Sequence, residues 1–313
     1  MNRTYPSENV WSIILAGGEG ERLRPLVQEW LGRHTPKQYC TFVGTRSMFQ
    51  HTLDRADQIT APARRVTVIA ESHQSDALEQ LAGRNAGKVI LQPTNRGTAA
   101  GIFLALTHVR MRNPDAVVVI YPSDHFVYPE DRFLKAIQGA VQAAEQMKHR
   151  LFLLGVTPDR PEPDYGWIYP GDHLTRIDGH SVWAVRRFLE KPSFEICSDA
   201  MAEGALWNTL ILTARVEHLW TLGWRCFPEM MSLLESYGES IGTWQELVLE
   251  AVYDVMPSRD FYTDLLQQVP EQVGVIKLTG IHWCDWGKPE RIVETLDRLG
   301  RHPAFSPELI GVR

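Results

Sequence analysis

Short runs of apolar residues alternate, through the first half of the chain, with longer segments in which apolar residues recur at helical spacing. The apolar runs are rich in Val, Ile and Leu, which is typical of strands that are covered on both faces of a sheet. This alternation of strand and helix predicts an α/β fold with a doubly wound, mostly parallel sheet. The expected strands are residues 10–15, 66–70, 89–93, 117–121 and 151–156, and the expected helices are 47–59, 72–81, 98–110 and 131–147.

The pattern changes after residue 157, where a rigid loop rich in proline occupies residues 158–164. Shorter alternating stretches around 166–170 and 181–189 predict antiparallel additions that carry a second ligand. Beyond about residue 256, a helix, a short strand at 273–278 and a last helix at 289–299 are expected to pack back on the sheet. We therefore expect a main domain at residues 1–255, with halves at about 8–157 and 158–255, and a C-terminal segment at 256–313.

Composition narrows the class of protein without identifying a ligand. Hydrophobic residues make up 44% and charged residues 22%, as in ordinary globular proteins, and the net charge of −6 disfavours binding to nucleic acid or to an acidic membrane. No apolar run approaches the roughly 18 residues of a membrane span, and the polar first ten residues predict no signal peptide. Four scattered cysteines indicate reduced thiols and a cytoplasmic location; they are Cys40, Cys197, Cys226 and Cys284.

The first expected strand runs into a glycine-rich loop, A-G-G-E-G-E-R-L-R-P-L, at residues 16–26. Glycines at the C-terminal end of a strand let the backbone approach a ligand and turn its N–H groups toward it. Arg22 adds forked donors that suit phosphate. A dinucleotide motif would need glycine at Leu23, and a P-loop would need lysine there, so both are excluded. A tight turn with an incidental arginine is the competing interpretation.

Lys37, in Thr35-Pro36-Lys37-Gln38, follows this loop closely enough to return over the same ligand. Together, L-A-G-G-x-G-x-R-L-x-P-L and P-K-Q resemble the signature of the sugar-1-phosphate nucleotidyltransferases, most of all mannose-1-phosphate guanylyltransferase. The resemblance implies a Rossmann-like, GT-A-like fold whose first half binds the nucleotide and whose second half binds the sugar phosphate. It also implies that the nucleotide and its phosphates are bound by Ala16, Gly17, Gly18, Gly20, Arg22 and Lys37.

Two aspartates match the carboxylates that bind Mg²⁺ in this family. Asp124 follows the strand 117–121 in P-S-D-H, which resembles the family's P-A-D-H, although an Asp at a strand end is also a common turn former. Asp285 lies in W-C-D-W-G-K-P, which resembles W-x-D-x-G-x-W with Pro289 in place of the last Trp. Mg²⁺ prefers one or two carboxylates together with phosphate oxygens and water. The resemblance therefore implies a Mg²⁺ cofactor held by Asp124 and Asp285, with His125 in an orienting or structural role.

Three further motifs resemble the sugar-phosphate side of the family. F-L-E-K-P at 188–192 matches F-x-E-K-P, which implies that Lys191 binds the sugar phosphate and Glu190 the sugar hydroxyls. A solvated Glu–Lys pair is the alternative. P-D-Y-G-W-I at 163–168 resembles T-G-Y-G-Y-I, in which Gly166 lets a sugar lie against the backbone. W-N-T at 207–209 resembles W-N-S-G without its Ser-Gly, which leaves Asn208 as the partner of a sugar hydroxyl.

The motif that reads the base is ambiguous. Q-P-T-N-R-G-T-A-A at 92–100 occupies the position of the guanylyltransferase E-P-x-x-R-N-T-A-P-A, with Gln92 for the acidic residue and Gly97 for the asparagine. A carboxylate suits the paired donors of guanine, whereas Gln offers a donor and an acceptor and can also pair with uracil or thymine. Thymidylyltransferases carry Q-P-x-x-x-G at this spacing. Overall similarity favours guanine, with Gln92, Gly97 and Thr98 in the nucleotide site.

The resemblance implies transfer of a nucleoside monophosphate from an NTP, with GTP favoured, to a hexose 1-phosphate, with mannose 1-phosphate favoured. The products would be an NDP-sugar such as GDP-mannose and pyrophosphate. A thymidylyl- or uridylyltransferase for another hexose 1-phosphate, and a catalytically silent nucleotide-sugar-binding regulatory protein, are the alternatives. No nucleic-acid or membrane partner is expected, and homodimer formation is left open. The residues expected to carry catalysis are Arg22, Lys37, Asp124 and Lys191.

Overall fold

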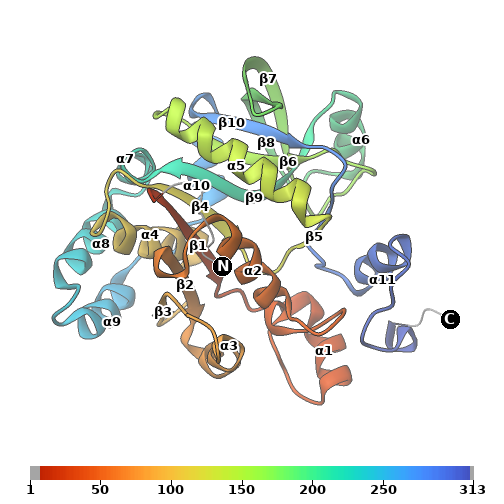
Figure 1. The fold of residues 1–313 in the computed structure, drawn as a ribbon, viewed down its shortest axis with the longest axis horizontal. Coiled ribbons are helices and arrows are strands. Elements are labelled where there is room, and N and C mark those ends of the chain that lie inside the picture. The colour runs from red at the N-terminus through yellow and green to blue at the C-terminus, as the bar shows by residue number, and fades with distance from the viewer. Residues whose placement is uncertain (1–7, 311–313) are drawn as a thin grey trace.

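A computed structural model describes residues 8–310, in which a nine-stranded sheet runs through the molecule in the order β3-β2-β1-β4-β9-β6-β10-β8-β7 (Figure 1). β3, β2, β1 and β4 are parallel, as are β6 and β10, so the expected α/β fold is confirmed. A separate two-stranded sheet joins β5 (Phe126–Tyr128) to β11 (His282–Cys284). The nine strands are β1 (Val10–Ala16), β2 (Arg65–Ala70), β3 (Lys88–Gln92), β4 (Val117–Pro122), β6 (Leu151–Val156), β7 (Gly166–Ile177), β8 (His180–Glu190), β9 (Leu206–Arg215) and β10 (Val273–Leu278).

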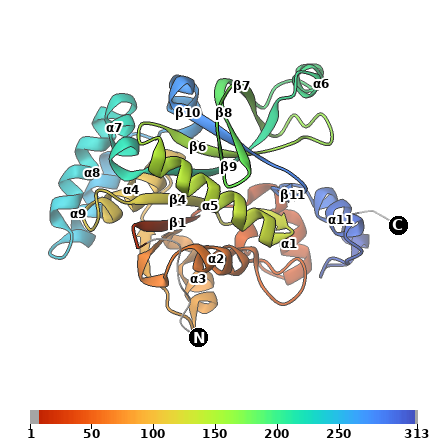
Figure 2. The same ribbon diagram turned by 45° about the horizontal axis from the view of Figure 1, so that its top comes forward.

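Helices cover both faces of the sheet because successive residues of each central strand face opposite sides. In β1, Ile13 packs into the cluster formed with α4 and α7–α10, whereas Ile14 packs into the cluster formed with α2, α3 and α5. Figure 2 shows α4, α8 and α9 together on one side of β1 and β4. The helices are α2 (Met48–Ile59), α3 (Gln74–Leu81), α4 (Gly97–Arg110), α5 (Glu130–Gln146), α6 (Phe194–Ala202), α7 (Val216–Cys226), α8 (Pro228–Ser240), α9 (Gln245–Val255) and α10 (Phe261–Asp264).

A third, smaller cluster lies at one end of the molecule, where α1 (Arg24–Leu31) and α11 (Pro289–Arg298) lie side by side in both views. Leu26 of α1 and Leu296 of α11 are both buried in this cluster. The two helices, from opposite ends of the chain, therefore share one apolar cluster, and both contact the short 3-10 turn at Pro307–Ile310. The segments that precede the two helices also meet, because Nη2 of Arg22, before α1, lies 3.0 Å from Oδ2 of Asp285, before α11.

Two features of the second half differ from the expected pattern. β7 and β8 form a much longer hairpin than the alternating stretches predicted, and it turns at Asp178-Gly179, which both have positive φ as an Asp-Gly hairpin turn requires. β10 lies between β6 and β8. The segment beyond residue 255 therefore contributes an internal strand to the sheet, and residues 261–269 pack in a core cluster on one face of the sheet. Its last helix, α11, packs instead into a smaller cluster whose described members include no residue of the nine strands.

Several sequence expectations can be compared with the described residues. Among residues 8–310, no helix is long and apolar enough to cross a membrane. The four cysteines all lie in this range and form no disulfide. The expectation that the chain has no signal peptide depends on the first ten residues, of which 1–7 lie outside the described part.

Candidate active site

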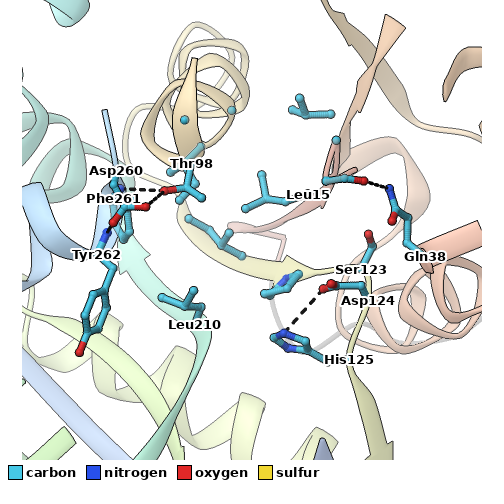
Figure 3. Close-up of a pocket in the computed structure, with 18 of the residues that line it drawn as sticks. Leu15, Gln38, Thr98, Ser123, Asp124, His125, Leu210, Asp260, Phe261 and Tyr262 are labelled. Carbon is cyan, nitrogen blue, oxygen red and sulfur yellow. Dashed lines mark hydrogen bonds and ion pairs between the residues drawn. The ribbon is translucent and has the colours of Figure 1, made fainter. Parts of the chain in front are cut away.

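A cavity of about 370 Å³ opens at the C-terminal ends of β1 and β4, where open α/β sheets bind their ligands. In Figure 3, Asp124 and His125 lie on one side of this cavity, and Thr98 and Asp260 lie on the opposite side. The cavity brings together the glycine loop, the Lys37 turn and both candidate metal carboxylates. Its polar and glycine lining includes Gly17, Gly18, Arg22, Lys37, Gln38, Gln92, Asn95, Gly97, Thr98, Asp124, His125, Asp260 and Asp285.

The glycine loop is held in place by the P-K-Q turn. Gln38, which is buried, donates from Nε2 to the carbonyl oxygens of Ala16 at 2.9 Å and of Gly18 at 2.8 Å. Tyr39 donates its hydroxyl to the same Ala16 oxygen at 3.0 Å. Gln38 has no predicted role within its sequence motif, and the structure gives it a positioning role. Gly20 packs against the backbone of Lys37, outside the described lining of the cavity.

Lys37 connects the two loops that carry the aspartates. Its side chain is only 5% exposed, and Nζ lies 2.6 Å from Oδ2 of Asp124 while donating to the carbonyl oxygen of Asp285 at 2.5 Å. Burial alone would raise the pKa of Asp124, but the charge of Lys37 and its hydrogen bond outweigh burial and hold that pKa below the ordinary value, and His125 lowers it further when its ring is protonated. Asp124 is therefore an anion at neutral pH, and its side chain, 37% exposed, borders the cavity.

The carboxylate of Asp285 is engaged on both oxygens. Oδ1 accepts hydrogen bonds from the Tyr165 hydroxyl at 3.0 Å, the Gly287 N–H at 2.8 Å and Arg291 Nη1 at 2.9 Å. Oδ2 lies 3.0 Å from Nη2 of Arg22. A Cβ on Gly287 would overlap this Arg22–Asp285 pair. The glycine of the W-x-D-x-G motif is therefore required at this position because no larger residue fits.

The pKa of Asp285 is well below its ordinary value. Burial works against ionisation, but the charges of Lys37 and Arg291 outweigh it, and the Gly287 N–H and Arg22 add to their effect. Hydrogen bonds and cations that favour the charged form lower a carboxyl pKa in this way. Asp285 is thus an anchored anion between three cationic side chains.

Arg291 is a site residue that sequence reasoning missed. Its side chain is 5% exposed, and Nη2 lies 2.5 Å from Oδ2 of Asp164 and 2.7 Å from Oε1 of Glu162. Lys288 reaches the same Asp164 oxygen at 2.6 Å. The unexpected Asp164 of the P-D-Y-G-W-I motif therefore contacts Lys288, from the motif around Asp285, and Arg291, which follows that motif. Pro289 occupies the first turn of α11, a position that favours proline, and starts the helix that carries Arg291.

The residues expected to bind the sugar phosphate lie outside the described lining of the cavity. Lys191 is 65% exposed and pairs with Glu190 at 3.2 Å, and the described lining of the cavity includes neither of them, nor Gly166 or Asn208. Tyr262 lines the cavity, and its hydroxyl would lie 3.4 Å from a Cβ at Gly166. Gly166 lies between Glu190 and Tyr262, and the roles of all four residues stay predictions.

On the nucleotide side, α4 is fastened to a loop of the C-terminal segment. The hydroxyl of Thr98 donates to Asp260 at 2.9 Å and accepts the N–H of Phe261 at 2.8 Å. Gly97 has φ +83°, and a Cβ there would overlap the carbonyl oxygen of Arg259. Residues 259–262 could not be found from the sequence, because no motif marks them and they lie far from α4 along the chain.

Gln92 is buried and lies where two hollows meet. Gln92, Gly17 and Asn95 line both the main cavity and an adjoining hollow of about 460 Å³, whose lining also includes Glu19 and Glu71. Oε1 of Gln92 would lie 3.4 Å from a Cβ at Gly17. The amide is therefore placed beside the glycine loop, as a base-reading residue would be.

The donors for a metal ion are few. Within residues 8–310, no three His, Cys, Asp or Glu side chains gather closely enough to hold a metal ion by themselves. Mg²⁺ requires only one or two carboxylates when phosphate oxygens and water complete its shell, so Asp124 at the cavity fits this role. To bind the metal ion, Asp285 would first have to give up one of its hydrogen-bond donors, such as Arg22. Its role as a ligand stays a prediction.

Comparison with known proteins gives the family. A family model for nucleotidyl transferases matches residues 11–301. The chain belongs to the nucleotidyl transferase family. Among curated relatives, the chain is 36% identical over 204 residues to a Xanthomonas campestris xanthan biosynthesis protein XanB, and 32% identical over 210 residues to an Escherichia coli mannose-1-phosphate guanylyltransferase. These matches cover 64% and 66% of this chain, but only 41% and 44% of the two relatives.

Two solved structures share the fold of this chain. A Thermus thermophilus protein, described as mannose-1-phosphate geranyltransferase, aligns with a TM-score of 0.77 at 23% identity, over 96% of this chain and 80% of that chain. An inositol-1-phosphate CTP transferase from T. maritima aligns with a TM-score of 0.58 at 15% identity, over 92% of each chain. At these identities the likeness supports the architecture alone. The substrates have to be inferred from the residues of the site.

Proposed function

We propose that this nucleotidyl transferase couples a nucleoside triphosphate to a sugar 1-phosphate and releases pyrophosphate, with Mg²⁺ as cofactor. One observation carries the proposal: the glycine loop, Arg22, Lys37 and two aspartates from remote parts of the chain meet at one cavity. Cations and backbone N–H groups beside carboxylates suit a triphosphate with a divalent ion better than they suit a neutral ligand.

In the proposed reaction, an oxygen of the sugar phosphate attacks the α-phosphorus of the NTP. A new P–O bond forms as the bond from the α-phosphorus to the bridging oxygen breaks, and pyrophosphate leaves with that electron pair. Mg²⁺, when bound at Asp124, would neutralise charge on the phosphates. The nucleophile is already an anion, so the protein needs no covalent intermediate, and its task is alignment and charge neutralisation.

Arg22 and Lys37 are the protein groups that would stabilise the leaving pyrophosphate. Arg22 is 53% exposed and borders the cavity, so its guanidinium can leave Asp285 for a phosphate without breaking the core. Lys37 is fixed between Asp124 and the Asp285 carbonyl and would supply a positive charge in a constant place. Lys191 keeps its proposed role in holding the sugar phosphate, which requires its exposed side chain to turn toward the cavity.

GTP and mannose 1-phosphate are the pair that we propose, supported by the names of curated relatives such as the Escherichia coli enzyme. Gln92 is the residue beside which the base would lie, because it lines both hollows next to Gly17. A glutamine can serve guanine through its acceptor oxygen or a pyrimidine through both groups. The base preference therefore has to be measured together with the sugar preference.

The test is a matrix of GTP, ATP, UTP and dTTP against mannose, glucose and related hexose 1-phosphates in the presence of Mg²⁺. Pyrophosphate is measured, and the NDP-sugar is identified by mass. We expect one equivalent of pyrophosphate per NDP-sugar, with GTP and mannose 1-phosphate giving the highest kcat/KM. If the protein binds a nucleotide but releases no pyrophosphate with any of the pairs, the proposal is overturned in favour of a catalytically silent regulatory protein. Highest activity with dTTP or UTP would overturn the base assignment alone.

A further inference from the structure

β9 contains a bulge directly beside the cavity. Leu212 of β9 pairs with Leu153 of β6, but the next pair is Asn208 with Gly155, so residues 209–211 lie opposite the single residue 154. Bulges of this kind re-aim a side chain and are common next to active sites. In this case the extra residues include Leu210, which lines the cavity.

Side chains of the bulge itself hold its shape. Thr209, which is fully buried, donates its hydroxyl to the carbonyl oxygen of Leu154 at 2.6 Å and accepts the N–H of Ile211 at 3.2 Å. Oδ1 of Asn208 accepts the N–H of Leu210 at 2.9 Å. Thr209 thus keeps the hydroxyl of the serine that it replaces in the W-N-S-G motif, and the bulge conformation is fixed on both sides of Leu210.

Leu210 replaces the glycine of that motif while keeping a backbone conformation suited to glycine. Its φ is +54°, a left-handed value that a bulky residue rarely adopts and that persists only where the surroundings impose it. The side chain is not hidden in the core, because Leu210 is 37% exposed. Figure 3 shows it between Tyr262 and His125 at the edge of the cavity. A strained conformation therefore presents an apolar side chain to the ligand space.

We propose that Leu210 is a specificity-determining residue that limits the size of the sugar. The inference rests on the proposed function and refines its substrate class. A glycine would leave open the space that the leucine side chain fills in the cavity, which Tyr262 also lines. The hydroxyl of Tyr262 in turn lies 3.4 Å from the position of a Cβ at Gly166, on the side expected to bind the sugar. Leucine offers no hydrogen bond to a polar substituent. The site accepts hexose 1-phosphates without a bulky substituent and excludes N-acetylhexosamine 1-phosphates.

The test uses Leu210→Gly, which removes both the side chain and the strain, and Leu210→Ala, which trims the side chain but keeps a Cβ. Leu78→Ala, at a 47% exposed leucine of α3 outside the cavity lining, is the control. For each protein, kcat/KM is measured for the preferred hexose 1-phosphate and for 2-acetamido analogues of glucose and mannose 1-phosphate. KM for the NTP is measured in parallel, and thermal unfolding checks that each variant is folded.

We expect both Leu210 variants to raise the ratio of kcat/KM for the acetamido sugar to that for the hexose by about tenfold or more, the range for a changed apolar contact in a specificity pocket. KM for the NTP should stay within about twofold, and Leu78→Ala should leave the ratio unchanged. An unchanged ratio in folded, active Leu210 variants would overturn the inference. Failure of the proposed function is distinguishable, since the wild-type chain would then release no pyrophosphate with any sugar phosphate.

Discussion

Arg291 donates from Nη1 to Oδ1 of Asp285 at 2.9 Å, from a position where its guanidinium is almost fully buried. The same group lies over the ring of Tyr165, 4.8 Å from the ring centre, and the Tyr165 hydroxyl donates to the same carboxylate oxygen. Arg291 and Tyr165 therefore join α11 to the loop before β7, and together they fix the carboxylate of Asp285, which also holds Arg22. A residue outside every recognised motif thus positions one of the predicted site aspartates.

Replacing Arg291 with Met should strongly destabilise the fold. The change would leave the buried Glu162 without its nearest cation and remove one of the three cations around Asp285, and breaking a buried ion pair from one side costs about 3–5 kcal/mol. The control is Arg298→Met, on the same helix, where a half-exposed pair with Asp159 should contribute about 0–1 kcal/mol. Urea unfolding at pH 7 measures both. Equal losses in the two variants would show that the Arg291 network is not structural.

Acid should destabilise the fold through buried histidines. His108 is 3% exposed, its Nε2 lies 2.7 Å from the Tyr237 hydroxyl, and burial lowers its pKa to about 3. The unfolded chain takes up this proton near the ordinary value of about 6.5, so stability is lost as pH falls from about 6.5 toward 3. His108→Gln should reduce the slope of the unfolding free energy between pH 6.5 and 4.5 without abolishing it, because burial also lowers the pKa of His125 and His218 to about 4. An unchanged slope in urea titrations would contradict this.

Replacing Gly97 with a larger residue should destabilise the fold, because the backbone of Arg259 leaves no room for a side chain. A Cβ at this position would overlap the Arg259 carbonyl oxygen, which also accepts the N–H of Ala99 at 3.1 Å. Gly97→Ala should therefore cost more than the roughly 1–2 kcal/mol of a left-handed non-glycine residue. Gly242→Ala is the matched control, since φ is +89° and no atom lies within 4 Å of its Cβ position. If both variants lose the same unfolding free energy, Arg259 does not constrain Gly97.

Arg22→Ala should lower kcat by roughly 10²–10³, the loss expected for one preorganised donor to developing charge. Arg24→Ala is the control, because Arg24 begins α1 two residues after Arg22 and pairs with Glu21 on the surface. Steady-state turnover with the best NTP and sugar phosphate measures both. Near-normal turnover in Arg22→Ala, or an equal loss in both variants, would remove Arg22 from the catalytic group.

The parts of the site that the sequence predicts are those carried by short motifs. The runs of Val, Ile and Leu placed the parallel strands within a residue or two, and the glycine loop, Lys37, Asp124 and Asp285 do share one cavity. These features depend on local chemistry and on one topological rule, that parallel strands end on the same side of a sheet.

The remaining features depend on contacts between distant segments. Arg291 belongs to the site only because α11 packs into the same cluster as α1, and Asp260 only because its loop lies against α4. β9 was not predicted as a strand, although its antiparallel insertion between β4 and β6 creates the bulge at Leu210. Periodicity within a segment contains no information on such pairings.

The most direct test of nucleotidyl transfer is pyrophosphate release by the wild-type chain and by Asp124→Asn, with Mg²⁺, GTP and mannose 1-phosphate. Asn keeps the size of the side chain but removes the charge that lies 2.6 Å from Lys37 and would hold the metal ion. We predict stoichiometric pyrophosphate and GDP-mannose from the wild-type chain, and turnover lower by about 10²-fold or more in the variant. Equal turnover by the two proteins would contradict the account.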